Sequence, residues 1–579
     1  MYRKYFFSVA LLAVFSIKAF SSGIQVQNTE VYTNSDKKSA QIKFSVSWEH
    51  SWRLIDGTPT NATLGMTDPR NWDAAWVFIK YRTLPGDNWF HAYISTAAAA
   101  TKPDMPAPAG GNYFDKDGKS EIKVCTSPAV LGSGAANPGV GAFIYRKGEG
   151  NGLITFTDVE LKWEFGLNGL TGGEQVEVCV IATEMVYIPT GAFNLGDETS
   201  VNSFRRQPEG YASVPYAITA ATGATNTNYN GYVAYVSNSI YNNASAAYSH
   251  ARNALHSANS SGRFGPLESG GVADDWATAN TSAATQATAF PAAYPSGFNA
   301  IYCMKYEITQ GEYLQFLNKN MVTVKNAKTY FHLPASDAVK QRYDIIQKSG
   351  TGVGPINVEF ELGDLNSSFL PCNWLGTKDI LAWMVWAGLR PMTEFEFEKI
   401  CRGTVNHPGT ASLRPVFAWG SPDFTNTVGF FNKDFANEGP SNPDANCAVA
   451  PGAVGANANM DGPMRAGGYA TPTSSRVKAG ATFYGVMEMS GNLRERAVSS
   501  GNANGRTFTG IHGNGEIGNG ANPQMPTGWP SLTAAGLGFR GGSYWDLPTR
   551  ARVSDRQDIN TNDVGRKANY GGRAVRTAP

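Results

Sequence analysis

The sequence predicts an N-terminal all-β sandwich over residues 24–183, followed by a larger α+β region over residues 184–579. Three observations predict this fold class. Short stretches of alternating apolar and polar residues recur in the first region, glycine and proline number 63 and 31, and helical patterns are confined to a few segments of the second region. Short alternating stretches between turn residues are typical of all-β domains, and frequent turn residues leave little room for long helices.

The strand pattern of the first region is clearest from Ala40 to Trp48, where apolar and polar residues alternate throughout. Stretches rich in β-branched and aromatic residues follow at Trp76–Arg82, Ala142–Arg146, Leu153–Phe156 and Val176–Val180. Many short strands separated by turn signals predict two packed sheets. The tryptophans of this region are expected to fill the core, with a sugar-stacking platform as the alternative.

The first 23 residues have the pattern of a secretory signal peptide. Arg3 and Lys4 precede an apolar run from Tyr5 to Ile17, and the small residues Ser21 to Gly23 follow. A basic start, a short apolar run and small residues are the parts of such a signal, and the run is too short to span a bilayer. We therefore expect an exported protein without a transmembrane segment, located in the periplasm, at the cell surface or outside the cell.

The charge composition argues against nucleic acid as a partner. Lys and Arg number 48 and Asp and Glu number 47, which gives a net charge of +1, whereas nucleic-acid binding requires a basic excess. Charge is scarcest over residues 217–297, which are rich in Ala, Ser, Thr, Asn and Tyr. A segment of this length and composition is expected to be an insertion that packs on its own domain or on another molecule.

The cysteines leave two possibilities open. The six are Cys125, Cys179, Cys303, Cys372, Cys401 and Cys447. An even number in an exported chain permits disulfides, but buried free thiols are equally compatible with it. No two of them form a Cys-x-x-Cys pair, so a zinc ribbon or a thioredoxin-like site is not supported.

Two helices are expected in the second region. The apolar stretch from Thr377 to Ala387 ends before Gly388, a typical helix stop. The second helix follows Thr393, whose hydroxyl is expected to cap it in a capping box with Glu396. This local role accounts for Glu396 without catalysis.

Several sequence blocks occur in a fixed order from about Met185 to the end of the chain. They are Val186–Gly196, Lys305–Leu317, Trp386–Glu398, Ala418–Gly420, Gly485–Arg496, Arg540–Tyr544, Arg552, Arg556, Asn560–Thr561 and Gly572–Arg573. In this order and composition they resemble the formylglycine-generating-enzyme (sulfatase-modifying factor) domain. The resemblance implies a C-type-lectin-like α+β fold that carries the low-charge insertion at about 217–297.

The chain departs from the catalytic members of that family. Those members bind copper with two cysteines shortly after the Gly-Gly-Ser-Tyr block, and the matching positions here are Asp546 and Ala551, with no cysteine after Cys447. Cu(I) prefers thiolate ligands. A related branch holds iron with three histidines, but here only His250 and His256 are close, and a spacing of six places them on no shared helical face. We therefore expect no catalytic residues.

The resemblance also implies a structural calcium site. The matching positions are Glu488, Gly491, Leu493 and Glu495. Two carboxylates and two backbone carbonyls are hard oxygen ligands that suit calcium. Alternatively Arg494 and Arg496, which replace tryptophans of the family pattern, neutralise the glutamates by ion pairs. A second family calcium site maps to Asn426 and Asp461.

Three functions are compatible with these features. The first is a non-catalytic structural or assembly protein of the cell surface or extracellular matrix that binds itself or other surface proteins. The second is a calcium-stabilised module that binds carbohydrate or peptide. Its expected ligand face consists of Trp545, Asp546, Arg550 and Arg552. The third is an oxidoreductase of changed chemistry. An acid pair from Asp555, Asp558 and Asp563 would serve it, although solvated or paired carboxylates explain these residues as well.

Overall fold

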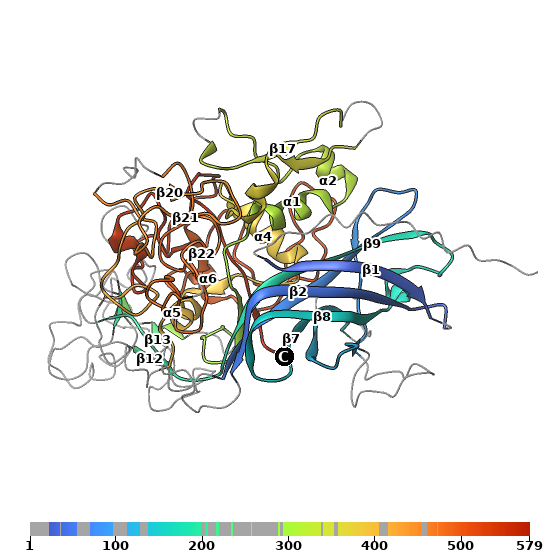
Figure 1. The fold of residues 1–579 in the computed structure, drawn as a ribbon, viewed down its shortest axis with the longest axis horizontal. Coiled ribbons are helices and arrows are strands. Elements are labelled where there is room, and N and C mark those ends of the chain that lie inside the picture. The colour runs from blue at the N-terminus through green and yellow to red at the C-terminus, as the bar shows by residue number, and fades with distance from the viewer. Residues whose placement is uncertain are drawn as a thin grey trace, which may run out of the picture.

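A computed structural model describes most of the chain (Figure 1). It describes residues 23–34, 36–54, 70–96, 113–127, 137–197, 203–205, 216–218, 233–234, 256–257, 288–289, 293–336, 340–351, 357–404, 415–452, 460–471 and 473–579. The predicted signal peptide and most of the predicted insertion at 217–297 lie outside these residues. Among the described residues, none of the helices has the length and apolar character needed to cross a membrane.

The dominant element of the described structure is a sheet of eleven strands. Its main path runs β24-β16-β9-β3-β2-β8-β5, with β1 beside β2, β4 and β7 beside β3, and β6 beside β7. These strands are β1 (Gln25–Thr33), β2 (Ala40–Leu54), β3 (Asn71–Thr83), β4 (Phe90–His91), β5 (Tyr113–Phe114), β6 (Ser120–Thr126), β7 (Gly139–Arg146), β8 (Gly150–Trp163), β9 (Val176–Ile188), β16 (Ile301–Met304) and β24 (Val575–Thr577). Every stretch for which the sequence predicted a strand falls within one of them.

The remaining elements are short. The other strands are β10 (Phe193–Leu195), β11 (Phe204–Arg205), β12 (Tyr216–Ile218), β13 (Val233–Ala234), β14 (His256–Ser257), β15 (Thr288–Ala289), β17 (Ile345–Gln347), β18 (Phe360–Leu362), β19 (Met392–Thr393), β20 (Phe430–Phe431), β21 (Gly439–Pro440), β22 (Glu495–Val498) and β23 (Leu537–Arg540). The helices are α1 (Gln310–Asn318), α2 (Val322–Asn326), α4 (Thr377–Trp386), α5 (Glu394–Arg402) and α6 (Ala503–Arg506), with single 3₁₀ turns at Phe165–Asn168, Leu365–Phe369 and Pro548–Ala551. The predicted β-rich chain with few helices is therefore confirmed.

Strand β3 is buried on both of its faces, which explains why its sequence is almost continuously apolar. Ala75, Val77 and Ile79 point into a core shared with β2, β8 and β9. Trp76 and Phe78 point the other way, into a core shared with α4 of the second region. Successive side chains of a strand face opposite sides, so one strand supplies two cores. The first region is therefore packed directly against the second (Figure 1).

Polar contacts reinforce this packing. The indole nitrogen of Trp76 donates to the carbonyl of Ala387 at 2.8 Å. The buried ammonium of Lys80 donates to the carbonyls of Trp386 and Gly515 at 2.8 and 2.6 Å. The carbonyls of Trp386 and Ala387 lie at the C-terminal end of α4, where a helix leaves carbonyls without internal partners. Side chains of the first region thus donate hydrogen bonds to the carbonyls at the C-terminal end of a helix of the second region.

The sheet continues across the predicted boundary at residues 183 and 184. Strand β9 pairs with β3 from Val176 to Val186 and with β16 from Met185 to Ile188. Strand β16 pairs in turn with β24 near the C-terminus. The two predicted regions therefore share one hydrogen-bonded sheet.

The second region contains all five described α-helices and is rich in loops, with a three-stranded sheet, β19-β22-β23. The predicted helix at 377–387 is α4, and the second is α5. Thr393 caps α5, and both hydrogen bonds of the predicted capping box with Glu396 are present. Glu396 also forms two hydrogen bonds with Arg390, at 2.8 and 2.7 Å. The six cysteines are all free thiols, and all except Cys179 are buried.

Candidate functional site

The 540–556 loop, which carries the predicted ligand face, is joined to a buried cluster of arginines and glutamates. Helix α5 supplies Glu394 and Glu398, and β23 supplies Arg540. Arg540 donates to Glu394 at 3.0 Å and to Glu398 at 2.8 Å. Arg556 donates twice to Glu394, at 2.6 and 3.0 Å. Burial alone would raise the pKa of Glu394, but Arg556 and Arg540 outweigh it and lower that pKa.

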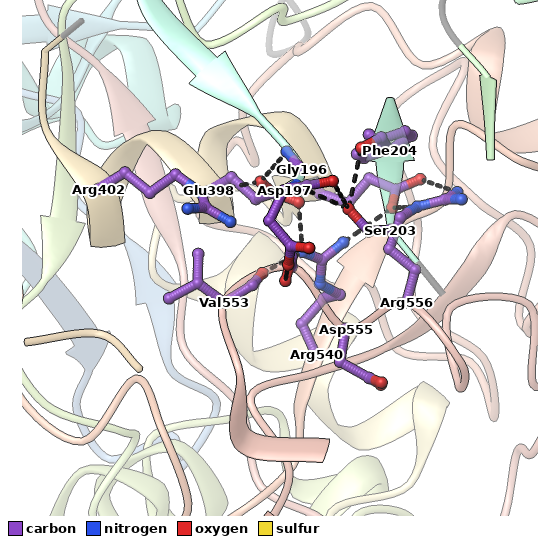
Figure 2. Close-up of polar contacts among 12 residues, drawn as sticks. Gly196, Asp197, Ser203, Phe204, Glu398, Arg402, Arg540, Val553, Asp555 and Arg556 are labelled. Carbon is purple, nitrogen blue, oxygen red and sulfur yellow. Dashed lines mark hydrogen bonds and ion pairs between the residues drawn. The ribbon is translucent and has the colours of Figure 1, made fainter. Parts of the chain in front are cut away.

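Glu398 joins this cluster to the backbone that follows β10, as Figure 2 shows. It accepts hydrogen bonds from Arg402 of the same helix at 3.1 Å and from the backbone N–H of Gly196 at 2.6 Å. Gly196 has φ of +78°, and a Cβ there would lie 1.7 Å from the carbonyl oxygen of Phe204. Glycine is thus required at this position, because a side chain would collide with the backbone of Phe204. The cluster fixes the base of the 540–556 loop.

Within the 540–556 loop, Asp546 accepts three hydrogen bonds. Arg494 donates to its two oxygens at 2.7 and 2.5 Å, and the hydroxyl of Ser543 donates at 2.6 Å. Asp546 is buried, and the side chain of Arg494 is 15% exposed. A two-point pair of this kind is among the stronger polar contacts in proteins. Asp546 therefore serves to anchor the loop.

Beyond Asp546, the network continues through side chains of alternating positive and negative charge. Arg494 lies 3.4 Å from Asp558, and Arg550 lies 3.8 Å from Asp558 and 3.9 Å from Asp555. Burial raises the pKa of Asp555 to about 6, with Asp558 adding to the rise and Arg550 opposing it. Asp563 is separate, because Lys567, the N–H of Gly565 and the Tyr570 hydroxyl hold it and lower its pKa to about 2. The three acids thus occupy two different environments.

Of the predicted ligand face, the structure connects Asp546 and Arg550 through this network. Trp545 packs on a small apolar cluster and stacks against Tyr544, with ring centroids 6.1 Å apart. Arg552 takes no part in the described ion pairs, and its Nε is buried without a hydrogen-bond partner. The four residues therefore line one loop but play different roles.

The turn that contains the predicted calcium ligands has an unusual backbone. Glu488, Gly491 and Asn492 all have positive φ, at 55°, 89° and 64°. A Cβ on Gly491 would lie 2.3 Å from the carbonyl oxygen of Ala448. Two of these residues are not glycine, and such conformations cost of order 1–3 kcal/mol each and concentrate at functional sites. Contacts elsewhere in the fold therefore have to offset the backbone strain of this turn.

The same turn holds two buried carboxylate oxygens without partners. One oxygen of Glu488 accepts from the N–H of Gly467 at 3.0 Å and one oxygen of Glu495 accepts from Arg573 at 2.6 Å. The second oxygen of each is buried and has no hydrogen-bond partner. Burial raises the pKa of Glu488 to about 7 and raises that of Glu495 as well. Two unsatisfied oxygens on one turn are suited to a cation.

Two neighbouring residues were not among the predicted ligands. Glu307 accepts from the side chain of Asn492 at 2.6 Å and from the N–H of Leu493 at 2.8 Å. Arg573 is the guanidinium beside Glu495, and it also donates to the carbonyl of Met487 at 2.7 Å. Both residues stand in the sequence blocks quoted above, but only the fold shows that they converge on this turn. Three buried carboxylates therefore surround one arginine.

The ion pairs proposed as an alternative to calcium do not form. Arg494 binds Asp546, as described. Arg496 lies over the ring of Phe539, 4.4 Å from its centroid, and donates to the carbonyl of Asp563. The reason is strand alternation: β22 directs Glu495 to the opposite side from Arg494 and Arg496. Arg573 makes the ion pair instead.

The second calcium position is engaged with protein groups. Asn426 accepts from the N–H of Val449 at 3.0 Å, and Asp461 pairs with Lys433 at 2.5 Å. More generally, the described residues contain no group of three or more His, Cys, Asp or Glu side chains arranged to hold a metal. The predicted ligands at the Glu488 turn include only two carboxylates, and the other two ligands are backbone carbonyls.

Comparison with known proteins agrees with this architecture. The family model described as the sulfatase-modifying factor enzyme 1-like domain matches residues 265–578. No curated protein matches the chain. The match includes α5, the Glu488 turn and the 540–556 loop, and it covers more than half of the 579 residues. The chain therefore belongs to the sulfatase-modifying factor enzyme 1-like family.

Proposed function

We propose that this protein is an exported, non-catalytic structural or assembly protein of the cell surface or extracellular matrix. In this proposal the N-terminal strands form a sandwich, and the family domain has the C-type-lectin-like fold. The domain then provides a rigid, loop-rich surface for binding, since one fold can host unrelated functions.

The observation that carries the proposal is the hydrogen bonding of Asp546. Asp546 and Ala551 occupy the positions of the copper-binding cysteines expected from the family pattern. Asp546 accepts from Arg494 and Ser543, and Ala551 has no functional side-chain atom. A carboxylate already bound to a guanidinium is poorly available to a metal or a substrate, because removing it would leave a charge unpaired. This supports an anchoring role.

The assembly role is supported by a protruding turn. Val428, Phe431 and Phe435 are 53%, 59% and 62% exposed. The turn is held in shape because the N–H of Asp434 donates to Glu438 at 2.8 Å, and Glu438 pairs with Arg342. Preformed apolar side chains bind partners at a low entropic cost. We expect this turn to contribute to contacts with a second copy of the chain or with another surface protein.

Ligand binding is the second candidate. It is favoured by the partly exposed Trp545 beside the charged chain of Arg550, Asp555 and Asp558. An aromatic ring beside fixed charges is a common arrangement for recognising carbohydrate or peptide. Calcium bound by Glu488 and Glu495 would then stabilise the module.

The mass of the mature chain in solution, measured by light scattering with and without a calcium chelator, tests the first proposal. We expect an oligomer, and we expect F431S/F435S to shift it towards the monomer. Leu365→Ser is the matched control, because Leu365 is 76% exposed but lies on a different segment. A wild-type monomer at every concentration would contradict the assembly role and leave ligand binding. Conversion of a cysteine-containing peptide in the presence of copper would contradict the non-catalytic role.

A further inference from the structure

Three charged residues from three neighbouring strands meet where the two regions join. Asp73 lies on β3, Glu184 on β9, and Lys305 directly follows β16. The Lys305 ammonium lies 2.9 Å from a carboxylate oxygen of Glu184 and 3.9 Å from one of Asp73. All three side chains are at most 6% exposed. They therefore form an enclosed triad that spans the shared sheet.

The register of the sheet brings them together. Ala75 of β3 pairs with Glu184, and Met304 of β16 pairs with Met185. The chain direction then places Lys305 beside Glu184, and its N–H donates to the Glu184 carbonyl at 2.9 Å. Asp73 lies two residues from Ala75, on the same face. The lysine side chain therefore crosses β9 to reach Asp73.

The surroundings of the triad exclude water and are rich in aromatic rings. The Lys305 ammonium is 5.0 Å from the ring centroid of Trp52 and 5.3 Å from that of Tyr306. Asp73 accepts hydrogen bonds from three donors, at 2.8, 2.8 and 3.0 Å. They are the indole of Trp48, the hydroxyl of Ser51 and the backbone N–H of Trp52. Both oxygens of Asp73 are thus fixed by donors before any reaction.

The charges of the triad do not balance. Two carboxylates face one ammonium, and an isolated buried carboxylate is costly, so the acids tend to retain a proton. Burial raises the pKa of Glu184 to about 7, and burial also raises the pKa of Asp73, with Lys305 opposing both rises. Burial alone would lower the pKa of Lys305, but Glu184 and Asp73 raise it. The two acids therefore favour the charged form of Lys305, while burial favours a proton on the acids.

We propose that Lys305 and Asp73 join in an intramolecular amide bond, with Glu184 as the proton carrier. Glu184 takes a proton from the Lys305 ammonium, and the freed nitrogen attacks the side-chain carboxyl carbon of protonated Asp73. Glu184 then returns the proton to the departing hydroxyl, so one water is released, one C–N bond forms and one C–O bond breaks. The nitrogen loses its second proton to Glu184, which therefore ends the reaction neutral. No oxidant, cofactor or other reactant is needed.

The geometry supports each part of this step. Reacting atoms need to approach to roughly 3–3.5 Å, and the Lys305 ammonium already lies 3.9 Å from an oxygen of the Asp73 carboxyl group. The donors on Asp73 would stabilise the negative charge that develops on its oxygens during attack. A carboxylate in contact with the lysine is the base that activates such a nucleophile. Exclusion of water then protects the amide.

The bond would fasten the two regions covalently. It would link positions 73 and 305 and so close a very long loop, which restricts the unfolded chain in the way that a disulfide does. The six cysteines of the described structure form no disulfide. An amide bond would supply a cross-link that reduction cannot break.

Intact mass spectrometry of the denatured mature chain tests this proposal directly. We expect a mass lower than that of the sequence by one water molecule. Trypsin should release a branched product in which residues 71–80 are attached to residues 264–319, because a modified Lys305 is no longer a cleavage site. The full sequence mass together with normal cleavage after Lys305 would overturn the proposal, whatever the behaviour of any variant.

Three variants assign the roles. Lys305→Met and Glu184→Gln should both retain the full mass. Lys399→Met is the matched control, because Lys399 is also buried but donates to the backbone carbonyl of Phe298 at 3.0 Å, and it should still lose one water. Loss of water in Glu184→Gln would overturn the role of Glu184. Loss of water in Lys305→Met would overturn the assigned bond.

Discussion

Arg494 and Asp546 form a paired hydrogen bond across 52 residues of sequence, with Nε at 2.7 Å from one oxygen and Nη2 at 2.5 Å from the other. The sequence resemblance matches these two positions to a tryptophan and to a copper-binding cysteine. In the fold they form a pair of opposite charge. The 540–556 loop is therefore held by an ion pair that requires both residues.

Joint removal of the two partners is expected to cost less than the sum of the two separate removals. Asp546→Ala leaves a largely buried arginine with a weaker partner, and Arg494→Met leaves a buried carboxylate. Each is expected to cost about 3 kcal/mol of unfolding free energy, with a coupling of about 1–3 kcal/mol in the double variant. Urea unfolding of all four proteins measures this coupling. The exposed pair Lys348 and Glu359 is the control, with an expected coupling below about 1 kcal/mol. Additive effects at Arg494 and Asp546 would contradict the pairing.

At the Glu488 turn, we expect a rise in pH to lower the stability of the fold and added calcium to raise it. The pKa of Glu488 is about 7 in the fold, against an ordinary value of 4.5. A carboxyl with a raised pKa binds its proton more tightly in the folded state, so its contribution is favourable at low pH. This contribution is lost as pH rises from about 4.5 to about 7, by about 3 kcal/mol in total. Calcium added at pH 8 should restore stability, because the cation replaces the proton.

Melting temperatures measured from pH 4 to 8 with calcium or with chelator provide this test. Glu488→Gln should flatten the fall with pH and abolish the response to calcium. Glu359→Gln, at an exposed position, should leave both unchanged. A wild-type protein that is indifferent to calcium at pH 8 would contradict a calcium site at this turn, even if the pH dependence were present.

Glu398 connects α5, β23 and the Gly196 backbone, so its charge matters more than its volume. Glu398→Gln preserves the shape but weakens the contacts with Arg402 and Arg540, which lie beside it in Figure 2. We expect a loss of roughly 3 kcal/mol, since an incompletely compensated buried charge remains. Glu359→Gln should change stability by less than about 0.5 kcal/mol. Equal effects of the two substitutions, in the same unfolding assay, would show that the cluster adds nothing beyond solvated charge.

Trp76 joins the two regions, and its removal should weaken the packing between them. Trp76→Ala deletes a fully buried ring and its hydrogen bond to Ala387, and it is expected to cost about 3–5 kcal/mol. Leu167→Ala, at a 44% exposed position, should cost less than about 0.5 kcal/mol. Calorimetry should show a lower melting temperature for Trp76→Ala. An unchanged melting temperature would contradict the inference that β3 is a core strand of both regions.

The sequence predicted those features that depend on neighbouring residues. The strands from Ala40 and Trp76 were predictable because side-chain alternation is a local property of an extended chain. The start of α5 was predictable because Thr393 and Glu396 bond within one turn. The almost uninterrupted apolar run of β3 indicated burial, but it did not show that α4 covers its second face.

The site was only partly predictable. Glu488 and Glu495 were identified through the family pattern, and the fold places an unsatisfied oxygen of each on the turn. No local pattern favours Arg573 over Arg494 or Arg496 as the partner of Glu495. That choice follows from the direction in which β22 points its side chains, and this direction depends on how β22 pairs with β23.

The sequence alone determined the β-rich character of the chain, its family and the start and end of its main helices. These properties rest on local hydrogen bonding, on apolar periodicity and on residue order. Only the tertiary structure decided which charges meet: Arg494 with Asp546, Arg540 with Glu394, and Lys305 with Glu184. These partners lie 52, 146 and 121 residues apart. A buried charge needs a partner, but its identity depends on chain closure and on packing, which residue order does not specify.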